Sequence, residues 1–364
     1  MGTATDCTDN KAKRIQSIDQ IRGYAIFGMI LVNYLGKFPA IPEAFKHHRG
    51  LGDYPPFGFS YADTIAPLFM FVVGMGFRLS FQRHVDNKGL WPARGAAIKR
   101  YTILILLGTL LYGMEFQWIW DALVDIGFAG LLALPFILGK GRTRMVVAVA
   151  YMVLYQFLYM NPQFWTLCIA LQENLPIWAS WFHLSQVADF TTYGEWTINK
   201  SIDGGPLGPI SWVFCLLLGT IAYDLMATND TRTIFKGCIA WGIGLCALGY
   251  LLRMQWGDFK APWYFTQYGM SAPYPIAATG LCFLTLALFY FTADIKGLNV
   301  PTLSILGINA LAIYCLQLLL LKFVGTFVDL QSTIPMAIFG FTLFYLCNYA
   351  VAFGLHKKNI IIRL

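Results

Sequence analysis

Charged residues are scarce in this 364-residue sequence, where Asp, Glu, Lys and Arg together make up only 12% of the chain. Soluble globular domains carry about 25% of such residues. Hydrophobic residues make up 57% of the chain, which leaves too little polar surface to cover a domain in water. The composition therefore excludes an ordinary soluble domain and predicts a protein whose solvent is lipid.

Short motifs of several common chemistries are also missing. The sequence contains no phosphate-binding G-x-x-x-x-G-K-[ST] loop, no dinucleotide fingerprint after a predicted strand and no G-x-S-x-G elbow. Its eight cysteines form no C-x-x-C pair and fall mostly inside apolar runs, as small buried residues do. We therefore expect neither a disulfide framework nor a metal site.

Long apolar stretches rich in Leu, Ile, Phe, Ala and Gly dominate the sequence. A membrane-spanning helix needs about 20 such residues, whereas a β-barrel shows short alternating strands. The pattern predicts an all-α polytopic membrane protein with about ten transmembrane helices. We place them near 21–38, 62–82, 97–114, 121–139, 144–161, 207–227, 235–253, 273–293, 302–321 and 333–355.

Basic residues are distributed unevenly between the two sides of these predicted spans. One side carries the large majority, beginning with Lys11, Lys13, Arg14 and Arg22 and ending with Lys357, Lys358 and Arg363. Because cytoplasmic segments carry the excess of Lys and Arg, both termini are predicted to be cytoplasmic. The asymmetry also accounts for the net charge of +7, so no nucleic-acid partner is implied.

The predicted organisation is one membrane domain, 21–355, between a cytoplasmic N-terminal segment, 1–20, and a cytoplasmic tail, 356–364. The longer connections, 39–61, 162–206 and 254–272, all fall on the outer side. Because binding residues often lie on loops, we expect an acceptor to approach from that side. The polar start, without a signal core, favours a bacterial cytoplasmic membrane.

Polar residues at the outer ends of the first two spans are candidates for chemistry. Adjacent His47 and His48 lie about 14 residues beyond Asn33, and Asp63 opens the second span. His47 is a candidate general base, which Asp63 would orient, and Asn33 is a candidate donor to a substrate carbonyl oxygen. The alternatives are solvated loop histidines, an asparagine bonded between helices and an aspartate that caps its helix.

At the inner mouth of the first span, Asp19 and Arg22 are three residues apart and share a helix face. They form either an anchoring ion pair or, in the case of Arg22, a contact for an anionic cytosolic ligand such as a phosphate. His84 and His356 flank basic inner segments and are interpreted as ordinary boundary residues.

Three stretches carry a family resemblance: RIQSIDQIRGYAIFGMILVNYLG (14–36), FKHH (45–48) and YADTIAPLFMFVVGMGFRLS (61–80). They resemble the heparan-α-glucosaminide N-acetyltransferase family and its bacterial relatives, with their patterns R-x-x-S-[LV]-D-x-x-R-G, N-Y-x-G, F-K-H and A-D-x-x-x-P-x-F-x-F-x-x-G. Weaker matches follow at 203–225, 290–298 and 306–314, so the resemblance extends over nearly the whole chain.

The resemblance implies an enzyme that moves an acetyl group from cytosolic acetyl-CoA, its co-substrate, to an extracytoplasmic amino sugar or related glycan. The family's active-site histidine falls on His47 and its asparagine partner on Asn33. The candidate contacts for the CoA phosphates are Arg22, Arg94, Lys99 and Arg100.

After the histidine, the segment HRGLGDYPPFGFSYAD replaces the family's Trp-Asn-Gly-x-Thr stretch. This departure leaves the acceptor open and keeps a second class of function in view. The alternative is a non-catalytic membrane scaffold, an accessory subunit or a transporter that retains the fold. The expected partners are membrane lipids, a small-molecule or glycan acceptor and, in a homodimer or membrane complex, other subunits.

Overall fold

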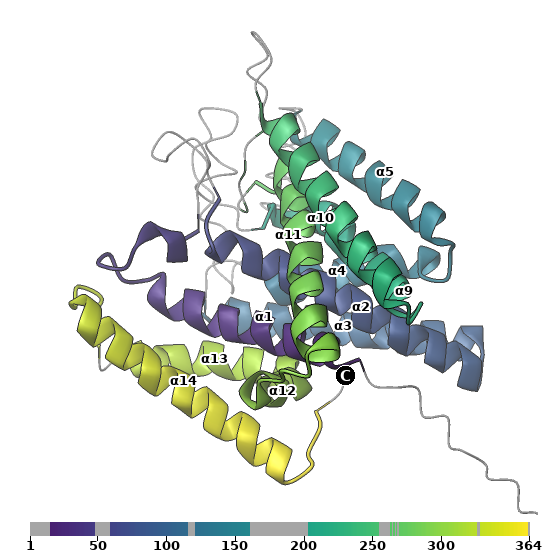
Figure 1. The fold of residues 1–364 in the computed structure, drawn as a ribbon. Coiled ribbons are helices and arrows are strands. Elements are labelled where there is room, and N and C mark those ends of the chain that lie inside the picture. Colours follow the sequence, from purple (N-terminus) through teal and green to yellow (C-terminus); the bar gives the residue numbers. More distant parts are fainter. Residues whose placement is uncertain are drawn as a thin grey trace, which may run out of the picture.

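The structure is a computed structural model that describes residues 15–47, 59–115, 121–160, 203–254, 263, 265, 267, 269–325 and 328–362. Every regular element within these ranges is a helix, as the sequence predicts (Figure 1). His48, residues 1–14, and most of the predicted outer loops 162–206 and 254–272 lie outside the described residues.

Eleven long or medium helices form the body of the described chain. Their bounds are α1 Gln16–Leu35, α2 Ala62–Lys88, α3 Leu90–Glu115, α4 Ala122–Ala133, α5 Gly141–Tyr159, α9 Gly208–Met226, α10 Thr231–Arg253, α11 Pro273–Phe289, α12 Pro301–Ile308, α13 Ala310–Gly325 and α14 Ile334–Lys357. Single turns add η1 Glu43–Phe45, η2 Leu134–Phe136, η3 Gly205–Leu207 and the π-helical turn η4 Tyr290–Ile295. Each predicted span therefore coincides with helix.

Six of the described helical segments are long and apolar enough to cross a membrane, and a bent pair raises the number to seven. The predicted count of about ten is therefore not confirmed in the described part of the chain. The helix α4 has only 12 residues, which is short for a span of about 20. The predicted continuous span 302–321 is instead two helices, α12 and α13, that meet at 89°.

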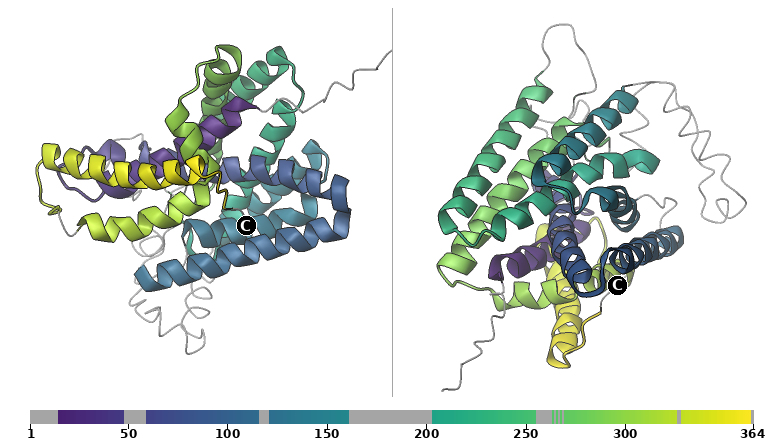
Figure 2. Two further views of the ribbon diagram at one scale, coloured as in Figure 1. Left: turned by 90° about the horizontal axis from the view of Figure 1, so that it is seen from below. Right: turned by 90° about the vertical axis from the view of Figure 1, so that its right-hand side faces the viewer.

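The helices pack in pairs that are distant in sequence as well as adjacent. α10 lies along α11, α3 along α4, α1 against α12 and α2 against α9 (Figures 1 and 2). α13 and α14 lie together on one side of the molecule, away from α5. Outer helices expose large apolar side chains such as Phe157 on α5 and Phe339 on α14, as expected of surfaces that face lipid.

The contact between α2 and α9 depends on two glycines placed reciprocally. A Cβ atom on Gly74 of α2 would collide with the carbonyl oxygen of Leu216, and one on Gly219 of α9 would collide with that of Phe71. Small residues let helix backbones approach closely in membranes. The glycine of the sequence pattern P-x-F-x-F-x-x-G, which is Gly74, therefore positions α2 and its first turn.

A partly buried ion cluster joins α2, α5 and α9. Arg78 donates through Nε to Asp224 over 2.9 Å and through Nη1 to the carbonyl oxygen of Ile137 over 3.0 Å. Arg144, which is fully buried, pairs with the same carboxylate and donates to Thr220 over 2.7 Å. Because each of these charges has partners, the cluster fixes the three helices relative to one another.

Candidate active site

The loop between α1 and α2 brings His47 to Asp63. The main-chain N–H of Tyr61 donates to the carbonyl oxygen of Ala44 over 2.9 Å, which folds the loop back onto the start of α2. His47 Nδ1 then lies 3.2 Å from Asp63 Oδ1. The structure thus brings together two of the residues that the sequence singled out.

Ser60 holds the Asp63 carboxylate in place. Its main-chain N–H and its hydroxyl both donate to Asp63 Oδ2 over 3.0 Å, and its hydroxyl accepts from the Asp63 N–H over 3.2 Å. The carboxylate is almost fully buried, whereas the His47 side chain is 33% exposed. With Nδ1 donating to the carboxylate, Nε2 is the ring nitrogen that can accept a proton.

A polar chain continues from Asp63 to Asp203. The Tyr274 hydroxyl lies 2.8 Å from the Asp63 carbonyl oxygen and 3.2 Å from Gln267 Oε1. The Gln267 amide donates to Asp203 Oδ1 over 2.7 Å. These hydrogen bonds thereby connect the loop before α9 and the start of α11 to the His47–Asp63 pair.

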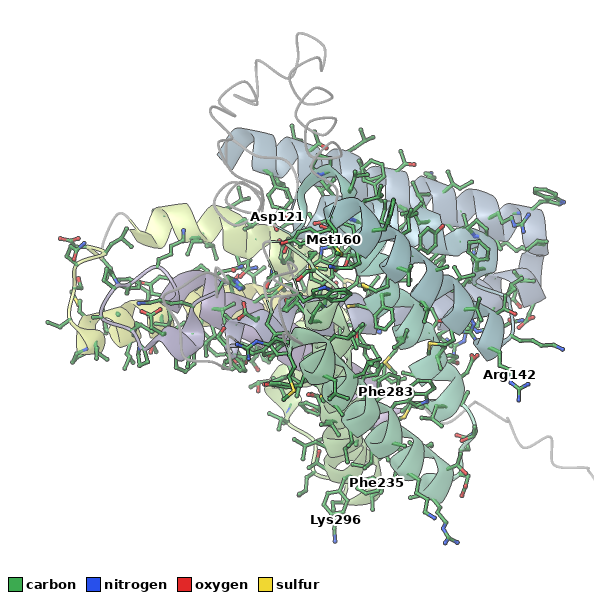
Figure 3. The ribbon with its side chains drawn as sticks, turned by 90° about the horizontal axis from the view of Figure 1, so that it is seen from above. Asp121, Arg142, Met160, Phe235, Phe283 and Lys296 are labelled. Atoms are coloured by element: carbon green, nitrogen blue, oxygen red, sulfur yellow. The ribbon has the colours of Figure 1, made fainter. Side chains whose placement is uncertain are left out.

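Three further carboxylates belong to this region, although the sequence patterns did not point to them. Asp121 and Asp203 act on His47, and Asp125 interacts with both. Asp121 accepts a hydrogen bond from the Ala122 N–H at the start of α4. Asp125 and Asp203 are buried. In Figure 3, Asp121 appears on the side of the molecule where α5 ends at Met160, and Arg142 marks the other end of that helix. Asp121 and Asp125 could have been found from the sequence, because they lie four residues apart in an apolar run. Carboxylates are costly inside a membrane, so those that occur there usually serve a function.

The pKa of His47 is raised above its ordinary value. Burial lowers it, but the hydrogen bond and the charge of Asp63, together with the charges of Asp203 and Asp121, outweigh that effect. The reason is that each nearby carboxylate stabilises the protonated ring. In the neighbouring group, burial raises the pKa of the Asp203 carboxyl.

A large cavity of about 1810 Å³ opens at the other ends of the helices, among residues 15–22, 79–88, 223–234 and 356–362. Its basic lining residues are Arg22, Arg83, His84, Lys88, Arg100 and His356. Asp19, 3.6 Å from Arg22, and Asp294, which accepts from the first N–H groups of α1, add negative charge.

Two of the four predicted phosphate contacts, Arg22 and Arg100, therefore line this cavity. Arg94 instead lies over the ring of Trp91 at 5.2 Å, and Lys99 is exposed, so neither belongs to its lining. His84 and His356, which the sequence suggested are boundary residues, both line the cavity.

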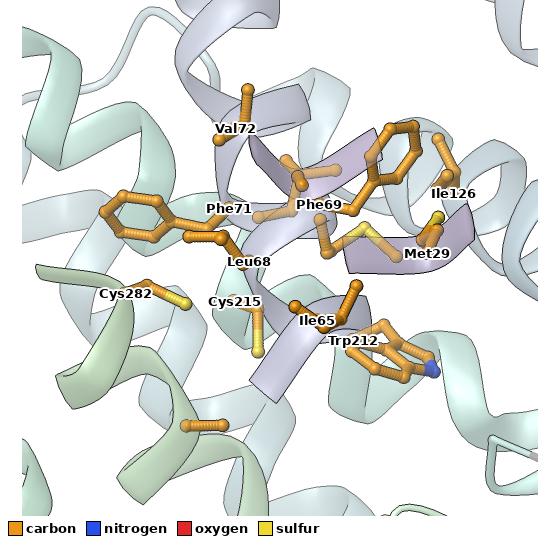
Figure 4. Close-up of a cluster of buried hydrophobic side chains, with 14 of the residues drawn as sticks. Met29, Ile65, Leu68, Phe69, Phe71, Val72, Ile126, Trp212, Cys215 and Cys282 are labelled. Carbon is orange, nitrogen blue, oxygen red and sulfur yellow. The ribbon is translucent and has the colours of Figure 1, made fainter. Parts of the chain in front are cut away.

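A second, small cavity lies between the large one and the carboxylates. It has room for about 10 Å³ and is lined by Met29, Ala66, Phe69, Met70, Ala122, Asp125, Ile126, Asp203 and Trp212. Phe69 and Ile126 also line the large cavity. Figure 4 shows these two side chains next to each other, with Met29 close by. The two cavities therefore share part of their lining.

Asn33 is half-buried in α1, and its side chain forms no hydrogen bond with another described residue. It lies four residues after Met29, so both occupy one face of the helix. Met29 lines the small cavity, and the Asn33 side chain lies one helical turn further towards the outer end of α1.

The helical body with apolar outer faces is that of a polytopic membrane protein. Its candidate reaction site lies between a basic cavity at one end and a histidine–carboxylate pair at the other. The sequence profile of the heparan-alpha-glucosaminide N-acetyltransferase catalytic family matches residues 14–249. The chain belongs to this family of membrane acetyltransferases, as the sequence patterns indicated.

One curated relative is an uncharacterized 39.9 kDa protein in the amylase 3' region of Bacillus acidopullulyticus, 31% identical over 131 residues. The match covers 34% of this chain and 34% of that protein. The described residues contain no group of three or more His, Cys, Asp or Glu side chains arranged to hold a metal ion. The expectation of a metal-independent reaction stays a prediction.

Proposed function

We propose that this protein transfers an acetyl group from cytosolic acetyl-CoA to an amino sugar or related glycan on the opposite side of a bacterial cytoplasmic membrane. The observation that carries the proposal is the arrangement of the two cavities. Phe69 and Ile126 line both cavities, and Asp203, which lines the small one, is among the carboxylates whose charges act on His47.

On the donor side, Arg22 and Arg100 bind the phosphates of CoA, with Arg83 and Lys88 on the same cavity wall. Guanidinium groups pair with phosphate oxygens through parallel hydrogen bonds, so they fit this ligand. The volume of about 1810 Å³ accommodates a molecule of this size. Arg94 and Lys99 remain predicted contacts on the same basic flank.

On the acceptor side, His47 takes the proton that the acceptor loses as it attacks the thioester carbonyl. Asp63 holds the ring in the tautomer that leaves Nε2 unprotonated, and Asn33 donates to the carbonyl oxygen as negative charge develops there. A general base contributes about 10²–10⁴ in rate, and one donor to the developing oxyanion contributes roughly 10²–10³.

Direct transfer and a two-step route through an acetylated His47 use the same residues. Incubation with radiolabelled acetyl-CoA, without acceptor, separates them. A label on the wild-type protein that a His47→Ala variant does not acquire supports the two-step route. Active protein that acquires no label supports direct transfer.

The experiment for the proposed function compares two adjacent histidines in purified protein. His47→Ala is expected to lower acetyl transfer from acetyl-CoA to glucosamine by about 10²–10⁴, the typical contribution of a general base. His48→Ala is the matched control and is expected to retain transfer, because the F-K-H pattern and the contact with Asp63 both involve His47.

Equal transfer by folded His47→Ala and wild-type protein would falsify the assignment. Acetyl-CoA that is neither bound nor turned over by the wild-type protein would support the alternative of a scaffold, an accessory subunit or a transporter.

A further inference from the structure

One face of α2 lines the large cavity along most of the length of the helix. Its lining residues recur every three or four positions, from Phe69 and Gly76 to Arg83 and Lys88, as one helix face requires. With a rise of about 1.5 Å per residue, this face is about 28 Å long. Phe69 is buried, Gly76 is half-buried, and Arg83 and Lys88 are exposed, so the cavity is deepest at Phe69 and opens near Lys88.

Basic side chains line this cavity at two depths, and the deeper ones lie level with Gly76. A Cβ atom at Gly76 would lie 3.8 Å from Nη2 of Arg22. On α3, Tyr101 packs edge-on against Phe77 with ring centroids 4.9 Å apart, which places the adjacent Arg100 at a similar depth. Nε of Arg100 is buried without a hydrogen-bond partner among the described residues. Because a buried donor usually has a partner, this inner tier of Arg22 and Arg100 fits a bound anion.

The second group, the outer tier, consists of Arg83 and Lys88 near the mouth. They lie about 10 Å and about 18 Å beyond Gly76 along the axis of α2, and both line the cavity wall. The carboxylates in the described lining, Asp19 and Asp294, belong to α1 and η4. The charge that α2 contributes to the cavity lining is therefore positive.

CoA has its negative charges at two corresponding positions. The pyrophosphate links the pantetheine arm to the ribose, and the 3′-phosphate lies beyond it on that ribose. Because the thioester at the end of the arm has to reach the neighbourhood of His47, the arm points to the deep end of the cavity and the 3′-phosphate to the mouth. In this orientation the inner tier meets the pyrophosphate, and the outer tier meets the 3′-phosphate.

We propose that Arg83 and Lys88 bind the 3′-phosphate of the donor and thereby make the protein select CoA over dephospho-CoA, which lacks this phosphate. The inference rests on the proposed function and deepens it by naming the part of the donor that determines its selection. A guanidinium group pairs with phosphate oxygens through parallel hydrogen bonds, and an ammonium group adds a point charge. Without the phosphate both cations stay solvated and add nothing to binding, so the difference appears in the affinity.

Calorimetric titration of the purified protein with CoA and with dephospho-CoA provides the test. Wild-type protein is expected to bind dephospho-CoA more weakly than CoA by about tenfold, the typical effect of losing charge-assisted hydrogen bonds. The ratio of the two dissociation constants should decrease at high salt, because the outer tier is exposed and salt screens its charges.

The double variant Arg83→Gln, Lys88→Gln is expected to weaken binding of CoA and to leave binding of dephospho-CoA unchanged, so that the ratio disappears. Both residues are exposed, so this variant should fold. The double variant Lys140→Gln, Arg142→Gln is the matched control. It removes the same two charges at exposed positions outside the cavity lining, and it should bind both ligands as wild type does.

Arg22→Gln, in the inner tier, gives the contrasting result, because it should weaken binding of both ligands by the same factor. The inference is overturned if wild-type protein binds CoA and dephospho-CoA equally well. It is also overturned if the Arg83→Gln, Lys88→Gln variant keeps the wild-type ratio, because another group then binds the 3′-phosphate.

These outcomes separate the inference from the proposed function. Acetyl transfer that depends on His47 but has the same kcat/KM for acetyl-CoA and acetyl-dephospho-CoA retains the function and rejects the inference. Selection of CoA through Arg83 and Lys88, in a protein that transfers no acetyl group, retains the inference and rejects the function.

Discussion

The His47 side chain is influenced by carboxylates from three separate segments of the chain. Asp63 begins α2, Asp121 precedes α4 and Asp203 precedes η3. Their combined charge outweighs burial and raises the pKa of the ring. A base must be neutral to accept a proton, so activity should increase with pH through a midpoint above the ordinary histidine value of about 6.5.

Asp63→Asn tests this electrostatic control at the residue scale. The substitution removes the charge and the ionic hydrogen bond that raise the pKa of His47, so the acid limb of kcat/KM should move to lower pH. The plateau rate should fall as well, because the ring loses the partner that selects its tautomer. A pH profile of acetyl transfer measures both effects, and an unmoved acid limb would contradict the assignment.

The contacts between helices depend on a few small residues. Gly74→Ala would press a methyl group onto the backbone of α9 at Leu216, and such overpacking costs about 1–3 kcal/mol. Gly95→Ala is the matched control, because a Cβ atom at Gly95 of α3 meets nothing within 4 Å. It should stabilise by about 0.4–1 kcal/mol. Thermal unfolding in detergent compares the two, and equal shifts would refute the close approach of α2 and α9.

The break between α12 and α13 anchors the segment after α14, residues 359–362. Asn309 at the break donates to the Ile360 carbonyl oxygen over 3.0 Å and accepts from the Ile362 N–H over 2.8 Å. This tail runs back from α14 towards the centre of the molecule (Figure 1) and lines the large cavity. The Asn309 side chain therefore holds in place a segment that forms part of the wall of the large cavity.

Asn309→Ala should release the tail and weaken binding of acetyl-CoA. The expected result is a higher KM for acetyl-CoA, an unchanged KM for the acceptor and faster proteolysis after α14. Gln331→Ala, at an exposed position, is the matched control. Asn229→Ala is unsuitable, because Asn229 lines the same cavity. An unaltered KM for acetyl-CoA after release of the tail would show that the tail is not part of the donor site.

At the scale of the whole molecule, the proposed direction of transfer requires the basic cavity to face the cytoplasm. In intact cells, an impermeant thiol reagent should label Lys37→Cys, beyond the outer end of α1, above the background of the parent chain. It should not label Lys88→Cys, which lines the large cavity, until the membrane is opened. The reverse pattern would invert the predicted topology and place the donor cavity outside.

The sequence alone determined the helical membrane architecture, the approximate positions of the apolar helices in the described part of the chain and the candidacy of His47 and Asp63. These follow from composition, from the length of apolar runs and from short motifs, all of which are local properties. Only the tertiary structure decided that α12 and α13 bend at Asn309, that Arg22 and Arg100 share a cavity, and that Asp121 and Asp203 lie near His47. Those features depend on contacts between helices far apart in the sequence, and no local pattern records which helices become neighbours.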